Sequence, residues 1–255
     1  MFEIIICIIA GLGAGFGTGF AGMSAAAVIS PLLITFLHMD PYLAVGIALA
    51  SDVLASAASA ITYGKNKNLD IKNGIIMMIS VLCFTMAGSY IASIVPKTTM
   101  GNFSVFMTLL LGIKFIVKPV TEPKQRLLAA TAKQKAIRSV AGGAAVGFIC
   151  GFVGAGGGMM MLLVLTSVLG YELKTAVGTS VFIMSATALT GSVSHFVIGG
   201  MPDVKALVIC VVSTLVFAQI ASLLANKLPA KTLNRITGAI LVVLGIAVLG
   251  VNYLA

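Results

Sequence analysis

Charge is scarce in this sequence. Only 9% of its 255 residues are Asp, Glu, Lys or Arg, whereas soluble domains carry about 25%. Hydrophobic residues make up 59%, and the mean hydropathy is +1.13. This composition excludes an ordinary soluble domain and predicts a multi-pass protein of the cell membrane, in contact with the lipid bilayer. A removable signal peptide is not expected, because Met1-Phe2-Glu3 has no basic segment and no small-residue cleavage site ends the first apolar run.

Residues that build catalytic or metal centres are also few. The four cysteines form no C-x-x-C pair, and no cluster of His, Cys and acidic residues has the pattern of a nucleophile or a metal site. We therefore expect no enzyme, no metal and no cofactor. The net charge of +9 could suggest nucleic acid, but the basic residues lie between apolar runs without stacking aromatics or a basic stripe. No nucleic-acid partner is expected.

Apolar runs dominate what is present. Two long runs, 4–37 and 139–169, contain glycine-rich breaks. Each is too long for one ordinary helical crossing and too short for two, so we expect a hairpin of two short helices that meet near mid-membrane. A non-helical tip at that depth must be buried in protein or line a wet cavity. Six further runs have close to the roughly 20 residues of a membrane-spanning helix: 41–63, 74–95, 100–117, 175–198, 206–225 and 236–254.

The sequence is an internal duplication. A shift of 132 places Gly19–Gly22 on Gly151–Gly154, and after a one-residue insertion a shift of 133 places Asp70 on Asp203. The predicted fold is an all-α polytopic membrane protein of two homologous repeats, each with a glycine-broken hairpin and three spanning helices. The predicted division is repeat 1 at 1–118, a cytoplasmic basic linker at 119–136, and repeat 2 at 137–255. Glycine breaks in corresponding positions indicate a transport site between the repeats.

The distribution of Lys and Arg favours repeats of inverted orientation. If each broken run crosses once, the repeats are parallel, and the 16 basic residues divide into 11 inside and 5 outside. If each broken run returns as a hairpin, they divide into 14 inside and 2 outside. The positive-inside rule prefers the second division. It places these loops in the cytoplasm: 64–73, 114–138, 170–174 and 226–235.

The two breaks are candidate anion sites. Each precedes a new helix, whose free N–H groups and positive dipole end attract anions. Glycine lets the backbone approach a ligand closely. The alternative is that the glycines only pack helices together. The candidate substrate-binding residues lie on the breaks and on the spans that follow them: Gly19, Ala21, Gly22, Met23, Ser24, Ser51, Gly154, Ala155, Gly156, Gly157, Thr179 and Ser180.

Asp52 is the only acidic residue near the middle of a full span. Charged groups at that depth are costly and usually functional, so the hypothesis is a coupling role through protonation, or a bond to the backbone at a break. The alternative is that Asp52 simply pairs with a neighbouring serine or backbone group. Its equivalent in the second repeat is Met184, so the second repeat has no such acid.

The second break resembles a known family signature. Gly151-Phe152-Val153-Gly154-Ala155-Gly156-Gly157-Gly158 and, further on, Ala176-Val177-Gly178-Thr179-Ser180 are similar to the repeated motif of the sulfite exporter TauE/SafE family. Ala44-Val45-Gly46 fits the weaker first copy, in which Ser24-Ala25-Ala26 replace the glycine triplet. In the second copy, Val164 stands roughly where the first has Pro31.

The resemblance covers essentially the whole chain and implies a function. The expected protein is a permease for small sulfur-containing anions such as sulfite, sulfoacetate or other organosulfonates. Two alternatives stay open: a carrier of another small anion such as a carboxylate, and a membrane scaffold subunit whose glycines only pack helices. Homo-oligomerisation is also left open.

Overall fold

In the computed structural model, the structure describes residues 1–92, 109–110, 112–123, 129–153 and 157–254. These residues form helices and connecting loops without a strand, which confirms the all-α class. The chain is a multi-pass membrane protein. The predicted span 100–117 lies largely outside the described residues. Six described helices are long and apolar enough to cross a membrane: Phe2–Ala21, Pro41–Lys65, Ile71–Gly88, Leu173–Val197, Val204–Lys227 and Ala230–Ala247.

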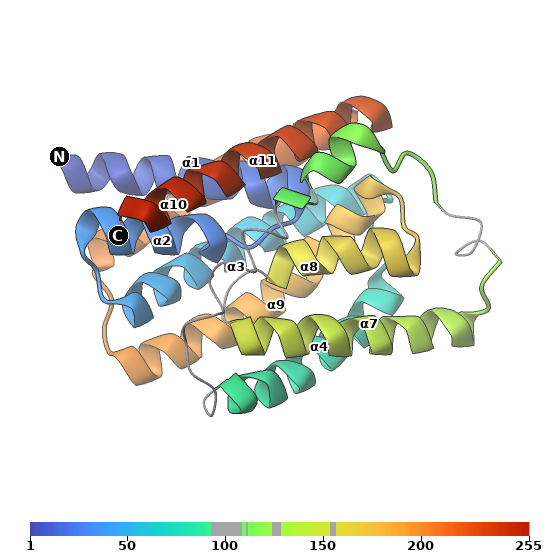
Figure 1. The fold of residues 1–255 in the computed structure, drawn as a ribbon, viewed down its shortest axis with the longest axis horizontal. Helices are drawn as coiled ribbons and strands as arrows, with labels where there is room; N and C mark the ends of the chain where they lie inside the picture. Colours follow the sequence, from blue (N-terminus) through green and yellow to red (C-terminus); the bar gives the residue numbers. More distant parts are fainter. Residues whose placement is uncertain (93–108, 111, 124–128, 154–156, 255) are drawn as a thin grey trace.

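The first broken run forms helices α1 (Phe2–Ala21) and α2 (Ala26–Leu37), which run in opposite directions (Figure 1). Helix α1 ends at Gly22, whose φ of 58° lies in the left-handed region that glycine adopts without a Cβ penalty. With 20 residues, α1 is longer than the short arm that we expected. Its other glycines do not break it, because several are enclosed by neighbouring helices.

The second broken run begins earlier than the apolar pattern indicates. Helix α7 spans Ala132–Val153, so its first turn lies inside the predicted linker. Thr131 and Gln134 explain this start, since each side chain bonds the backbone N–H of the other in a capping box. Beyond the break, helix α8 (Gly157–Val164) continues into a short π-helix, η2 (Leu165–Leu169). Gly154, Ala155 and Gly156 lie outside the described residues.

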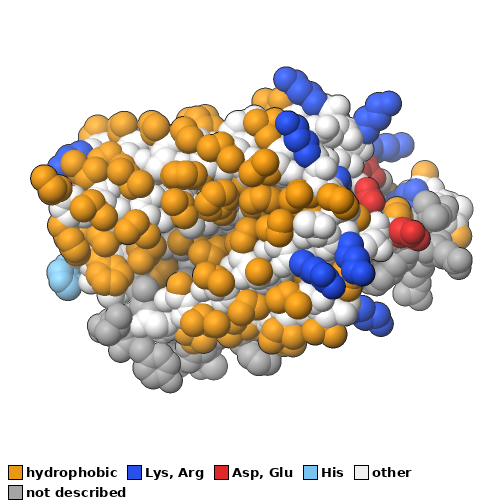
Figure 2. All heavy atoms as spheres, turned by 90° about the horizontal axis from the view of Figure 1, so that it is seen from above, with side chains coloured by type: hydrophobic (Ala, Val, Ile, Leu, Met, Phe, Trp, Pro, Cys, Tyr) orange, Lys and Arg blue, Asp and Glu red, His pale blue; other side chains and the backbone are white. Residues whose placement is uncertain are grey.

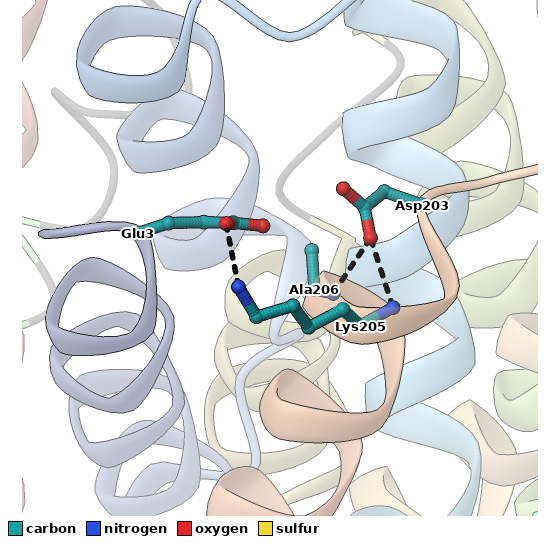
Figure 3. Close-up of polar contacts among 4 residues, drawn as sticks. All are labelled: Glu3, Asp203, Lys205 and Ala206. Atoms are coloured by element: carbon teal, nitrogen blue, oxygen red, sulfur yellow. Dashed lines mark hydrogen bonds and ion pairs between the residues drawn. The ribbon is translucent and has the colours of Figure 1, made fainter. Parts of the chain in front are cut away.

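The described fold also contains a helical segment at 112–117 and five longer helices: α3 (Pro41–Lys65), α4 (Ile71–Ala92), α9 (Leu173–Gly199), α10 (Val204–Lys227) and α11 (Ala230–Leu254). Aspartates cap the starts of several of them. Asp203, for example, accepts bonds from the backbone N–H groups of Lys205 (2.8 Å) and Ala206 (3.1 Å) at the start of α10 (Figure 3). Such caps satisfy donors that a helix start leaves free.

The two halves of the chain pack on each other through reciprocal contacts. Helix α1 packs on α10, and α7 packs on α4. A Cβ on Gly11 would lie 2.7 Å from the Cβ of Ser213, and a Cβ on Gly143 would lie 2.8 Å from the Cβ of Ser80. These four residues are equivalent under the sequence shifts of 132 and 133. The same close helix approach therefore occurs twice, each time between one helix from each half.

Lys and Arg side chains gather at one end of the molecule, and hydrophobic side chains cover most of the rest of the face in Figure 2. Both chain termini lie at the opposite end (Figure 1). At that opposite end, Lys205 pairs with Glu3 at 3.1 Å (Figure 3). The apolar belt is the surface expected to face lipid.

Candidate functional site

The carbonyl groups at the C-terminal end of α1 are bonded by hydroxyl groups. Four side chains from four helices each donate one hydrogen bond. A helix end left without partners inside a membrane would cost several kcal/mol per group, so these hydroxyls stabilise the first break. The bonds are Thr18 to the Met23 carbonyl (3.0 Å), and Tyr63 to Gly19, Thr237 to Phe20 and Ser180 to Gly22 (2.9 Å each).

The backbone N–H groups at this break fall into two sets, one that bonds carbonyls of α1 and one that belongs to the start of α2. Those of Gly22 and Met23 bond back to carbonyls of α1, at 2.9 and 3.3 Å. They belong to the end of α1 and not to the start of α2. The donors that belong to α2 begin with Ala25 and Ala26, and the Ala26 N–H bonds the Ser24 hydroxyl oxygen at 3.3 Å. Ser24 thus caps the first turn of α2 by a local bond, although the formal N-cap is Ala25.

The carboxylate of Asp52 accepts a hydrogen bond from the other of these two donors, the backbone N–H of Ala25. Asp52 is fully buried on α3, and its Oδ2 accepts the Ala25 N–H at 3.2 Å. Its Oδ1 accepts the hydroxyl of Ser56, one turn further along α3, at 2.7 Å. The acid thus bonds backbone at a break, which the hypothesis named, and also a neighbouring serine, which the alternative named. A negative group at a helix N-terminus is electrostatically favourable.

The two breaks meet inside the protein. Gly158, in the first turn of α8, packs directly on the backbone of the first break. A Cβ there would lie 2.5 Å from the Ser24 nitrogen, 2.8 Å from the Met23 Cα and 2.9 Å from the Gly22 oxygen. Only glycine permits this approach, since the neighbouring atoms are backbone. The N-terminal ends of α2 and α8 consequently lie side by side.

Comparison with known proteins identifies the family. The family model for the sulfite exporter TauE/SafE matches residues 7–248. The chain belongs to this family. It is 27% identical to the "Probable membrane transporter protein YunE" of Bacillus subtilis (strain 168), over 95% of this chain and 96% of that protein. It is 22% identical to the "Probable membrane transporter protein YdhB" of the same strain, over 85% and 88% of the two chains. The chain is thus a membrane transporter of the TauE/SafE family.

The structure gathers part of the predicted site of this TauE/SafE transporter. Gly22, Met23, Ser24 and Ser180 lie together at the meeting point of the breaks, close to Asp52. Met23 is buried and fills the space beside Gly17. Gly157 begins the helix that contacts them. The other three predicted residues on the second break, Gly154, Ala155 and Gly156, lie outside the described residues.

Other predicted residues have packing contacts or bonds away from that point. Gly19 packs on α10, since a Cβ there would lie 2.5 Å from the Cβ of Ala221, and Ala21 is fully buried. The Ser51 hydroxyl donates to the Ile47 carbonyl of its own helix at 2.8 Å. The Thr179 hydroxyl oxygen accepts the backbone N–H of Asp70 at 3.2 Å, near the basic end.

Several contributors are not among the candidate substrate-binding residues. Ser56 and Tyr63 follow Asp52 at four and eleven positions, a helical spacing that places all three on one face of α3. That spacing is a usable signal. Thr237 reaches the break from α11, and Gly158 reaches it from α8. No local sequence pattern predicts either contact, because both depend on how helices distant in the sequence pack together.

A second polar cluster joins the halves of the transporter at the basic end. The Asp70 carboxylate accepts bonds from the Tyr171 hydroxyl and the Asn73 amide, both at 2.7 Å. Burial raises the pKa of Asp70, but these hydrogen bonds outweigh it, so the pKa lies below its ordinary value. Burial and the bond to this carboxylate raise the pKa of Tyr171. Nearby, the side chains of Asn68 and Asn226 bond at 2.7 Å.

Proposed function

We propose that this transporter is a permease for small sulfur-containing anions, such as sulfite, sulfoacetate or other organosulfonates, which it binds where the two breaks meet. The observation that carries the proposal is the contact of Gly158 with Gly22–Ser24. It brings two helix N-termini to one point near the middle of the fold, where their dipoles and N–H groups act on the same small volume. Membership of the TauE/SafE family supports the substrate class.

The surrounding groups fit a weakly held anion. The described residues at the meeting point contribute backbone amides and the Ser24 hydroxyl, but no Lys or Arg. Neutral donors bind an oxyanion less strongly than a guanidinium would. Moderate affinity suits a carrier, which must also release its substrate. Asp52 would couple this binding to protonation, since it shares the same donors.

Inverted repeats would produce alternating access around this point. The reciprocal contacts of Gly11 with Ser213 and of Gly143 with Ser80 support a pseudo-two-fold relation. The gathering of Lys and Arg at the end opposite both termini supports a cytoplasmic location for that end (Figures 1 and 2). Both termini would then be extracytoplasmic. A reporter fused to the C-terminus that is active only in the cytoplasm would contradict this orientation.

A carboxylate carrier is the second candidate. The observation that favours it is Asp52, because a carboxylate already fits the N-terminal donors of α2. A panel of ligands separates the two candidates. At equal concentration, a ligand that binds the native state more tightly raises its stability more, by an amount that grows with the logarithm of the affinity. We expect sulfite and organosulfonates to raise the melting temperature of the purified transporter more than matched carboxylates such as acetate.

Gly158→Ala tests the location of the site. The added Cβ would push the two breaks apart, so we expect the variant to lose ligand-induced stabilisation. Gly147→Ala is the matched control: its Cβ would also crowd backbone, 2.9 Å from the Val81 Cα, but between α7 and α4. Both variants lose stability, and only Gly158→Ala loses binding. Folded Gly158→Ala protein with parental affinity would disprove the site, and no stabilisation by any anion would favour the scaffold alternative.

A further inference from the structure

Asp52 is held entirely by neutral groups. Within the described part of the chain, the groups that hydrogen-bond or act on its carboxylate are Ser24, Ala25 and Ser56, and no charged side chain is among them. Burying a carboxylate without a cation is costly. Its position is therefore an unusual one for a group whose only task is packing, and the second half of the chain packs a methionine, Met184, at the equivalent place.

The charged groups of the surrounding helices are distant from this carboxylate along the chain. Helices α1, α2, α9 and α10 pack around α3. The titratable residues closest to it along α3 are Tyr42 and Tyr63, ten and eleven positions away, and the Tyr63 hydroxyl bonds the Gly19 carbonyl. The cationic, acidic and imidazole side chains of α3 and of these helices lie at or near the helix ends: Glu3, His38, Lys65, Lys174, His195, Lys205 and Lys227.

We propose that Asp52 is a tethered competitor of the transported anion. In the empty carrier its carboxylate takes the Ala25 N–H, and the substrate anion binds by replacing it at that donor. The inference rests on the proposed function. In this structure a fully buried carboxylate already occupies the donor at the start of α2. The chain itself thus supplies an anionic group, the Asp52 carboxylate, at the start of α2.

Ser56 can keep its hydrogen bond to the Asp52 carboxylate after the substrate has displaced that carboxylate from Ala25. Its hydroxyl bonds the other carboxylate oxygen, Oδ1, so Asp52 can lose the Ala25 N–H and keep one partner. Two anions at one point would repel each other strongly at low dielectric. Uptake of the substrate anion is therefore favoured when Asp52 binds a proton. This exchange would link one proton to one anion.

The test compares Asp52→Asn with the native full-length chain. The probe is methanesulfonate, whose charge does not change near neutral pH, and the readout is its Kd for purified protein at several pH values. We expect native binding to tighten as the pH falls. The Asp52→Asn protein, which lacks the competing charge, should bind about tenfold more tightly at neutral pH and show no pH dependence. Asp40→Asn is the charge-matched control, since Asp40 caps α3 and an asparagine can also cap.

A double-mutant cycle tests whether anion and carboxylate share one donor. Ala25→Pro removes that N–H, and the φ of −57° at Ala25 suits proline at a helix start. Affinity should fall, and Asp52→Asn should no longer tighten binding when it is combined with Ala25→Pro. If the Asp52→Asn protein does not fold, Asp52→Met, which introduces the residue type of the other half, replaces it in the test.

The outcomes separate this inference from the proposed function. If native protein binds methanesulfonate and Gly158→Ala abolishes binding, but folded Asp52→Asn protein keeps the native Kd and pH dependence, the competitor role is wrong and the site stands. If methanesulfonate, sulfite and sulfoacetate bind neither the native nor the Asp52→Asn protein, the proposed function itself is wrong. Full additivity in the cycle would show that the anion uses a different donor from Asp52.

Discussion

The two halves of the chain agree in how their helices pack and differ in the polar groups at their centres. Gly46 packs on His195, since a Cβ on Gly46 would lie 3.2 Å from the His195 Cβ. Its equivalent, Gly178, packs on Tyr63, the equivalent of His195, where the same distance would be 2.8 Å. Each half thus supplies the glycine of one contact and the partner residue of the other. Close approach of helices through small residues is a general solution in membranes.

The polar groups do not follow this symmetry. Asp52 corresponds to Met184, and Tyr63, which bonds the first break, corresponds to His195, which bonds the Tyr42 carbonyl near one end of the fold. The difference teaches that equivalent positions in the two halves keep the same helix packing while their polar groups differ. The proposed transport site between the halves would therefore be asymmetric, even though these packing contacts recur in both halves.

The largest expected effect comes from breaking the shared packing. Gly15 lies against α10, where a Cβ would be 2.8 Å from the Thr214 oxygen, and Gly147 lies equivalently against Val81 of α4. Replacing either with valine forces the helices apart, because the atoms in the way are backbone. We expect each change to destabilise by about 3 kcal/mol or more. The measurement is the melting temperature of the purified variants.

Gly250→Val is the control, because a Cβ at Gly250 would meet nothing within 4 Å. It should leave the melting temperature nearly unchanged. Comparing the melting temperatures of the Gly15→Val and Gly147→Val variants tests whether the two packing contacts are equivalent. A large loss at one and none at the other would show that the two packing contacts are not equivalent.

The sequence predicted the scaffold better than the site. Composition and run lengths were sufficient for the helical class, because membrane crossing imposes a length and a hydropathy on each helix. The interruption of the run 4–37 and the position of Asp52 inside a helix also came from local patterns. The partners of Asp52 did not: Ala25 is 27 residues away, and the bond depends on how α2 packs on α3. The start of α7 was misplaced because Thr131 and Gln134, which cap it, lie in polar sequence.

A smaller effect is expected where the halves use equivalent aspartates differently. Asp70 bonds Tyr171 across the halves, whereas Asp203 only caps its own helix. Because the pKa of Asp70 is lowered in the folded state, its contribution to stability is complete above the unfolded value of about 3.9 and is lost as the pH falls through the lower folded value. Asp70→Asn should cost about 1 kcal/mol at neutral pH, discounted because the group is half exposed.

The measurement is thermal unfolding from neutral pH down to about pH 3, a range that includes the ordinary aspartate pKa. The native protein should lose stability at the acid end, and the Asp70→Asn protein should lose less of it there. Asp203→Asn, in which the cap is conserved, is the matched control. An acid dependence that is the same in the native and Asp70→Asn proteins would assign the acid response to other groups.

The smallest effect concerns the ion pair of Lys205 with Glu3, which has no counterpart among the described residues of the first half. Lys72, the equivalent of Lys205, lies in the first turn of α4, as Lys205 lies in the first turn of α10. The Lys205 side chain is 56% exposed and that of Glu3 is 32% exposed.

Solvent and salt screen such a pair, so Lys205→Met should change stability by less than about 0.5 kcal/mol. The melting temperatures of the native and Lys205→Met proteins should converge as salt is raised. A large loss that persists in high salt would show that the Lys205 side chain stabilises this end by packing, and that its charge is secondary.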